Sequence, residues 1–95
     1  MSELDGLDVF VAICEEGSIT RAGDRLGMPR STVSRQLSRL EEDLGVRLVH
    51  RTTRRLVLSE AGQELYVRAR RVVDDARAAR EAVRRQDDVP RGRLR

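Results

Sequence analysis

The fold is decided by residues 18–45, which read SITRAGDRLGMPRSTVSRQLSRLEEDLG. Ser18 is placed to cap a short helix, and Gly27 ends it, because glycine adopts the left-handed conformation of a helix terminus without strain. Pro29 then opens a second helix that runs to about Leu44, since a proline in the first turn removes only an N–H that has no helical partner. Two helices joined by a tight turn that contains glycine predict a helix-turn-helix.

The second helix of this pair has two different sides. At about 100° per residue its apolar side chains stack on one side, which we expect to face the core. They are Val33, Leu37, Leu40 and Leu44. The other side carries cations and hydroxyls in its N-terminal two-thirds and acids only in the last turns, the reverse of the order that an isolated helix prefers. Such a helix keeps its N-terminus clear for an external anion such as phosphate, although an ordinary solvated face would also allow this order. The residues opposite the core side are Ser31, Arg35, Ser38, Arg39 and Glu42, with Thr32 and Ser34 flanking them. We use the name outward face for the cations and hydroxyls of the N-terminal two-thirds: Arg30, Ser31, Thr32, Ser34, Arg35 and Arg39.

After residue 45 the apolar pattern becomes short and β-branched. Residues 46–51 and 56–58 flank a polar turn and predict a two-stranded hairpin, which we call the wing. Within nine residues it carries four arginines and no acid: Arg47, Arg51, Arg54 and Arg55. An arginine-rich hairpin beside a helix-turn-helix can reach a phosphate backbone or a narrow minor groove. A solubilising charged turn is the alternative explanation of these charges.

A long helix follows the wing over about 60–86, with Ser59 placed to cap it. Its apolar residues recur at alternating intervals of four and three, which is a heptad seam. The seam consists of Leu65, Ala69, Val72, Ala76, Ala79 and Val83. A helix of this length spans about 40 Å, more than the rest of so small a domain is wide. We therefore expect the seam to pair with a second copy, rather than to fold back on its own domain, and two copies imply a two-fold-related DNA site.

The composition agrees with a small, mainly α fold. Charged residues make up 37% of the 95 residues and aromatic ones 2%, which suits helices with an aliphatic core better than a β-sandwich. Cys14 is the only cysteine, so an internal disulfide is excluded, and on the first predicted helix, 3–15, it is expected to be a small buried hydrophobe. The single histidine, His50, has no partner spaced for a metal site. No apolar run approaches the ~20 residues of a membrane span, and the acidic N-terminus is unlike a signal peptide, so a cytoplasmic protein is expected.

Several longer stretches together resemble the N-terminal region of LysR-type transcriptional regulators. They are LDVFVA at 7–12, EEGSITRA at 15–22, RLG at 25–27, STVSRQL at 31–37, LEEDLGVRL at 40–48, HRTTRR at 50–55 and LSEAG at 58–62. The resemblance covers nearly the whole chain and implies a winged helix-turn-helix of three helices and a two-stranded wing, followed by a long dimerisation helix. It also implies a bacterial regulator that binds interrupted palindromes of double-stranded DNA as a dimer, or as a tetramer when full length.

The same resemblance implies roles for single residues. The major groove would be faced by Arg30, Ser31, Thr32, Ser34 and Arg35. The start of the second helix would touch phosphate through Ser18, Thr20 and Arg21. On the wing, Arg51 would hold backbone, Arg54 would enter the minor groove, and Thr53 lies between them. Two departures stand out. The family often has glutamine at the position of Arg30, and the arginine would favour guanine where glutamine favours adenine. Gly23 replaces a common alanine, which costs about 1 kcal/mol in helix propensity.

The chain is expected to divide into three parts: a DNA-binding domain at 1–58, a dimerisation helix at 59–86, and a hinge at 87–95. The hinge would lead to an effector-binding domain that is missing here, so a small-molecule inducer would act only through that domain. Two other functions compete with this interpretation. One is a protein of a different winged-helix family, such as a stand-alone repressor or an architectural nucleoid protein, and the other is an adaptor that dimerises by its coiled coil and binds an acidic protein. An enzyme is least favoured, because no carboxylate pair and no Ser-His-Asp set has a structural context, and no cofactor or metal is expected.

Overall fold

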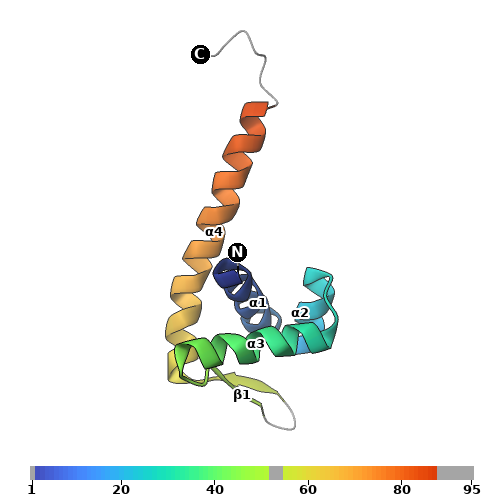
Figure 1. Cartoon of the computed structure of the whole chain (residues 1–95), viewed down its shortest axis with the longest axis vertical. Coiled ribbons are helices and arrows are strands. Elements are labelled where there is room, and N and C mark those ends of the chain that lie inside the picture. Colours follow the sequence, from blue (N-terminus) through green and yellow to red (C-terminus); the bar gives the residue numbers. More distant parts are fainter. Residues whose placement is uncertain (1, 52–54, 88–95) are drawn as a thin grey trace.

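The computed structural model describes residues 2–51 and 55–87, with the side chains of 2–5 and of 87 left out. Three helices and a small hairpin are gathered at one end, and a long helix projects from them (Figure 1). The elements are α1 (Ser2–Glu16), α2 (Ile19–Leu26), α3 (Arg30–Leu44), β1 (Val49–Arg51), β2 (Leu56–Leu58) and α4 (Glu60–Asp87). The predicted mainly α fold with a two-stranded wing and a long last helix is therefore confirmed.

The helix-turn-helix forms as its end signals predict. The backbone N–H of Arg21 donates to Ser18 Oγ at 3.2 Å, so Ser18 is the N-cap of α2. Gly27 ends α2 with a φ of 70°, a left-handed conformation that costs a glycine little. The N–H of Met28 then donates to the carbonyl of Gly23 at 2.9 Å and closes the turn.

Packing explains why a glycine occupies position 23, in spite of its low helix propensity. A Cβ at this position would lie 2.6 Å from the carbonyl oxygen of Met28, which belongs to the turn backbone and cannot rotate away. The absence of a side chain therefore lets the turn close tightly against α2. Glycine has a lower helix propensity than alanine at this position, but the Cβ of an alanine would disturb the close approach of the Met28 carbonyl to α2.

The start of α3 differs from the prediction by one residue. Pro29 is the N-cap, with an extended ψ of 149°, and the helix begins at Arg30. The carbonyl of Pro29 accepts the N–H groups of Thr32 at 3.0 Å and Val33 at 3.2 Å. At the other end Gly45 terminates the helix with a φ of 71°. Leu44, which the spacing assigned to the core side, is 51% exposed because it lies in the last turn, beyond the packed part of the helix.

The core is centred on α1, which is buried on more than one side. Phe10 and Val11 are buried, and so are the neighbouring residues Val9, Ala12 and Ile13. Helices α2, α3 and α4 all pack against α1, so a single apolar stripe does not describe it. The main cluster consists of Val9, Phe10, Ala12, Ile13, Ile19, Ala22, Val33, Leu37, Leu48 and Val49.

The wing is an antiparallel pair in which Val49 lies opposite Leu58 and Arg51 opposite Leu56. Its second strand leads directly into α4 through Ser59. The Ser59 hydroxyl donates to the carbonyl of Arg47 at 2.7 Å and accepts the N–H of Gly62 at 3.0 Å. One side chain thus caps α4, as predicted, and also fixes this helix to the base of the wing.

The first part of the α4 seam packs against its own chain. Ala69 and Val73 are buried with Val11 of α1 in a second cluster, which Leu65 and Tyr66 cover. Ala69 is therefore not available to a partner helix, which corrects that expectation. Leu65 is only partly covered, so its pairing with a partner helix stays a prediction. The heptad spacing did not predict that Val73 is buried. An a/d seam follows one line of residues along the helix, whereas α4 packs on α1 partly through the neighbouring line that contains Val73.

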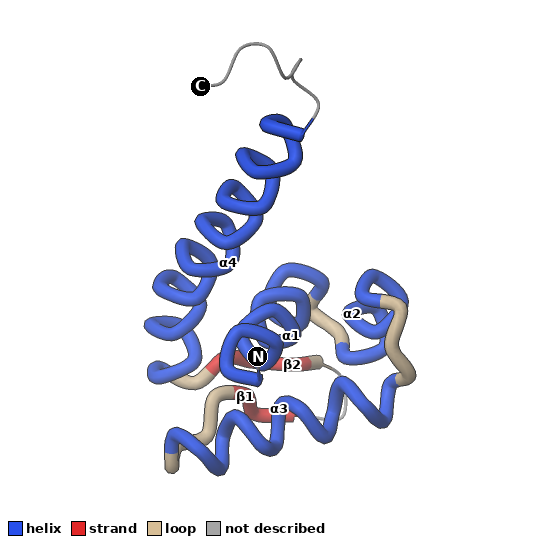
Figure 2. The backbone as a smooth tube through the Cα atoms, turned by 45° about the horizontal axis from the view of Figure 1, so that its top comes forward, coloured by secondary structure: helices blue, strands red, loops and turns tan. Residues whose placement is uncertain are grey.

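The far part of α4 extends away from the other elements (Figure 2). The remaining seam residues follow Ala69 along this helix. Val72 is 45% exposed and Val83 is 70% exposed. Ala79 is exposed too, and Ala76 is half-buried. We call these four residues the distal seam. In this single chain nothing described covers them except in part at Ala76, so the heptad pattern remains a prediction of pairing over this segment.

An ionic network ties α2 and α4 to the end of α1. Arg25 of α2 forms ion pairs with Glu15 at 3.0 Å and with Glu16 at 3.4 Å. On the other side, the hydroxyl of Tyr66 in α4 donates to Glu15 Oε2 at 3.0 Å. Burial alone would raise the pKa of Glu15, but hydrogen bonds from Arg25 and Tyr66 outweigh it and hold this pKa below its ordinary value.

Acid is expected to remove the contribution of Glu15 to stability. Its pKa is lower in the folded chain than in the unfolded one, so the ionised form stabilises the fold above the ordinary value of about 4.3. That stability is lost as the pH falls through the lowered folded pKa. Glu15→Gln should therefore be less stable than the wild type at pH 7 and lose less stability on acidification, measured by urea unfolding at several pH values.

Glu64→Gln is the matched control for this experiment. Glu64 pairs with Arg68 within α4 at 3.1 Å, and its side chain is 68% exposed, so its contribution is small. We expect this variant to follow the wild-type pH profile. A Glu15→Gln profile that also runs parallel to the wild type would show that the network does not stabilise the fold through the charge of Glu15.

Candidate nucleic-acid interface

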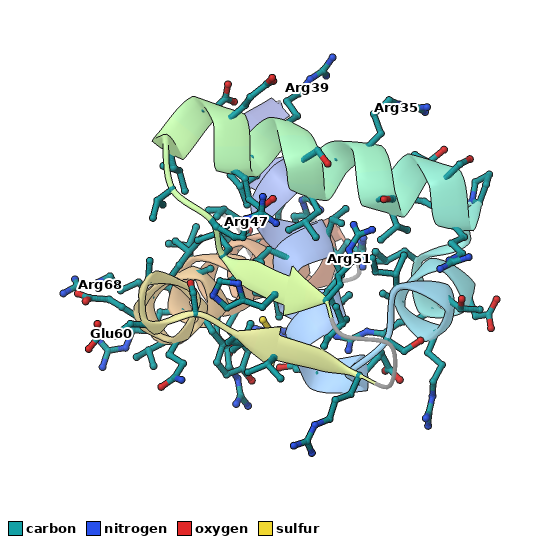
Figure 3. The ribbon with its side chains drawn as sticks, turned by 90° about the horizontal axis from the view of Figure 1, so that it is seen from below. Arg35, Arg39, Arg47, Arg51, Glu60 and Arg68 are labelled. Carbon is teal, nitrogen blue, oxygen red and sulfur yellow. The ribbon has the colours of Figure 1, made fainter. Side chains whose placement is uncertain are left out.

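The core fixes which side of α3 is turned outward. Val33 and Leu37 are buried, so the helix cannot rotate without exposing them. On the outer side, Arg35 and Arg39 project away from the wing (Figure 3). The outward face is solvent-accessible at Arg30, Ser31, Arg35 and Arg39, and half-buried at Thr32 and Ser34. The arrangement gives a rigid row of cations and hydroxyls along one helix.

The N-terminal end of α3 suits an anion. No side chain caps it, because Pro29 has none that could accept a hydrogen bond, and its first turn contains no acidic residue. The positive end of the helix dipole is therefore not neutralised by a carboxylate of that turn, and it coincides with Arg30. Backbone N–H groups and a guanidinium at one helix end form the kind of site that binds phosphate oxygens.

The wing lies against the same helix. Arg51 projects from β1 toward α3 (Figure 3), and its Nη2 donates to Ser34 Oγ at 3.0 Å. Within α3, Arg35 Nη2 donates to Thr32 Oγ1 at 3.3 Å. The structure thus brings together two residues predicted from different elements, Ser34 on the outward face and Arg51 on the wing.

Glu41 is a contributing residue that sequence reasoning missed. Its Oε2 accepts the backbone N–H of Leu48 at 2.8 Å and that of Val49 at 3.2 Å. The carboxylate therefore binds the end of α3 to the start of β1. In the sequence Glu41 is one of three consecutive acids, and no periodic signal separates it from Glu42 and Asp43, because its partners are backbone groups of another element.

The other predicted contact residues lie apart from this pair. Thr20 and Arg21 are exposed on the first turn of α2. The hydroxyl of Ser18 is already engaged as the N-cap of that helix. Thr53 and Arg54, expected on the wing tip, lie outside the described residues.

Residues 2–51 and 55–87 contain no group of three His, Cys, Asp or Glu side chains placed to hold a metal ion. No helix in those ranges is long and apolar enough to cross a membrane. Cys14 is half-buried against the core, and burial, followed by the neighbouring charge of Glu15, raises the pKa of its thiol to about 12.

Known bacterial regulatory proteins are similar to nearly the whole length of this chain. Residues 4–63 match the family model described as "Bacterial regulatory helix-turn-helix protein, lysR family". The transcriptional regulator CrgA of Neisseria meningitidis serogroup C is 45% identical over 89 residues, which are 94% of this chain and 30% of that protein. The regulator PtxR of Pseudomonas aeruginosa is 44% identical over 92 residues, 97% of this chain and 30% of that protein. The chain thus spans about a third of the length of these relatives.

Two solved structures that resemble the chain are complexes with DNA. The BenM DNA-binding domain bound to catB site 1 DNA superposes with a TM-score of 0.83 at 31% identity, covering 92% of this chain and 98% of that one. The CbnR DNA-binding domain bound to DNA gives a TM-score of 0.77 at 32% identity and covers 88% and 97% of the two chains. Full-length OxyR of Pseudomonas aeruginosa gives 0.80 at 27% identity, but only 28% of that chain is covered.

Proposed function

Because this chain belongs to the lysR family of bacterial helix-turn-helix regulatory proteins, we propose that it binds a specific double-stranded DNA site through α3 and the wing. The observation that carries the proposal is the contact of the wing with α3, in which Arg51 donates to Ser34 of the same helix that carries Arg35 on its outer side. A helix of this kind fits the major groove, where side chains distinguish all four base pairs. The named relatives are transcriptional regulators, not enzymes.

In this proposal the residues divide by what they touch. Arg30 and Arg35 read base edges, with guanine as the preferred partner of an arginine, and Ser31, Thr32, Ser34 and Arg39 complete the contact along α3. Phosphates are contacted by Ser18, Thr20 and Arg21 at the start of α2 and by Arg51 on the wing. Thr53 and Arg54, at the wing tip, contact backbone and the minor groove. Phosphate contacts set the register of the protein on the duplex, and base contacts set the sequence.

The second part of the proposal concerns assembly. Residues 1–58 would bind DNA and 59–86 would pair two copies through the distal seam. The hinge expected at 87–95 lies, apart from residue 87, outside the described residues. The two copies would bind a two-fold-related site whose half-sites are one helical turn or a multiple apart. A tetramer and a response to a small molecule would require an effector-binding domain, and the same proposal places the protein in the cytoplasm.

The test compares Arg35→Ala with Arg51→Ala on a site first selected from random-sequence duplexes. Arg35→Ala should cost about 1–3 kcal/mol on the selected site and relax the preference at one base pair. Arg30→Ala should behave alike. Arg51→Ala should weaken selected and random DNA equally and lower the salt slope by about one. The affinities are measured by titration on the selected site, its single-base variants and random DNA at several salt concentrations.

Arg80→Ala is the control for these charge changes, since Arg80 is exposed on α4, far from the proposed contact surface. We expect its affinity and salt slope to equal those of the wild type. A uniform loss for Arg35→Ala across all sequences would make it a backbone contact. The absence of any preferred site among the selected duplexes would overturn specific binding altogether.

A further inference from the structure

The wing is fastened to α3 at two places. Near the end of the helix, Glu41 accepts two backbone N–H groups of the segment that enters β1. Seven residues earlier, Ser34 accepts a hydrogen bond from Arg51 at the end of β1. A separation of seven residues is about two helical turns, so both side chains leave α3 on the same side. The strand therefore runs along the helix and is held at each end.

We propose that Ser34 is a positioning residue that holds Arg51 in place before DNA arrives, so that α3 and the wing bind as one unit. The inference rests on the proposed DNA-binding function and changes the role given to Ser34. In the resemblance this serine faces the groove and makes its own contact. Here its hydroxyl accepts the Arg51 guanidinium at 3.0 Å, and its half-buried place beside Val33 leaves it little reach of its own.

The geometry leaves Arg51 free to act while it is held. A guanidinium has five N–H donors in a planar fork, and Ser34 uses the Nη2 group. Arg51 is exposed, so a phosphate oxygen can approach its guanidinium, a group that binds phosphate in bidentate fashion. Its backbone is fixed by the pairing with Leu56. A side chain that is ordered in advance loses less rotamer freedom on binding.

The two roles of Ser34 predict different measurements. A serine that reads a base would, when replaced by alanine, change the preference at one base pair and leave the salt slope intact. A serine that positions Arg51 would, when replaced, weaken binding to all sequences and move the salt slope toward that of Arg51→Ala. The second pattern is expected here, because Ser34 acts on DNA through a phosphate-binding cation.

The experiment is a double-mutant cycle of Ser34→Ala and Arg51→Ala in the 95-residue chain, measured on the selected site and on random duplex DNA. Ser34→Ala alone should weaken binding about 2- to 10-fold on both. In the Arg51→Ala background the same substitution should change the affinity by no more than the measurement error, because the two residues form one interaction. Ser34→Thr, which keeps the hydroxyl, should bind like the wild type. If Ser34→Ala weakened binding only by disturbing the fold, its effect would be the same with and without Arg51.

Two results would overturn the positioning role. One is additivity, in which Ser34→Ala costs the same with and without Arg51. The other is a change of base preference at a single position with an unchanged salt slope. Failure of the proposed function looks different: the wild-type chain would then prefer no selected site, while the cycle on random duplexes would still measure the coupling between Ser34 and Arg51.

Discussion

Replacing Val72 and Ala76 together by glutamate is expected to turn a dimer into a monomer. Both residues belong to the distal seam. Val72 is 45% exposed in the single chain, Ala76 is half-buried, and neither belongs to the two core clusters. Across a two-fold axis they would place like charges against one another in a contact that is otherwise apolar. Two linked DNA-binding surfaces gain about 10²- to 10⁴-fold in avidity, and affinity for a two-fold site should fall by that order. Sedimentation and titration on the selected site measure the two effects.

A control with the same change in composition is available on the same helix. Val67 and Ala78 are exposed, and at about 100° per residue they lie on the side of α4 away from the distal seam. Val67→Glu with Ala78→Glu should leave the dimer and its affinity intact. If the seam variant sediments as the same dimer, or if the control dissociates equally, the proposed pairing surface is wrong.

Gly62→Ala is expected to destabilise the fold by about 1–3 kcal/mol, the usual cost of overpacking, even though alanine favours helices over glycine. The Cβ would overlap the carbonyl oxygen of Leu48, with the carbonyl carbon and Cα of that residue next in line. All three are backbone atoms at the base of the wing, so no rotamer change can relieve the overlap. Helix α4 and the wing would have to move apart, and the chemical denaturation midpoint measures the loss.

Gly6→Ala is the opposite case on α1. A Cβ at this position would meet only Leu40 Cδ1 at 3.9 Å, an ordinary van der Waals distance. The substitution should stabilise the fold by about 0.5–1 kcal/mol through helix propensity alone. Equal effects of the two substitutions would mean that propensity, and not the contact between α4 and the wing, governs Gly62. The Gly62 variant should also bind DNA more weakly, since the same backbone carries Arg51 through β1.

The sequence by itself determined the order of the elements and most of their ends, although α3 begins one residue later than predicted and β1 only at Val49. Ser18 and Ser59 cap helices as their positions predict, and Gly27 and Gly45 end helices with positive φ. These signals depend on a side chain and the backbone within one turn of it, so they can be recognised without the rest of the fold. The buried side of α3 at Val33 and Leu37 was predictable for the same reason, since a repeated apolar spacing defines one face.

Only the tertiary structure decided how those elements meet. Glu41 binds backbone groups of another element, and Ser34 meets a side chain 17 residues away. Periodicity also assigned Ala69 to a partner helix, whereas its contact with α1 in the same chain buries it. In each case the deciding partner lies on a different element, and the distance between the two is set by how helices and strands pack. A local sequence pattern predicts which side of an element is apolar. Which neighbouring element covers that side depends on how all the elements pack together.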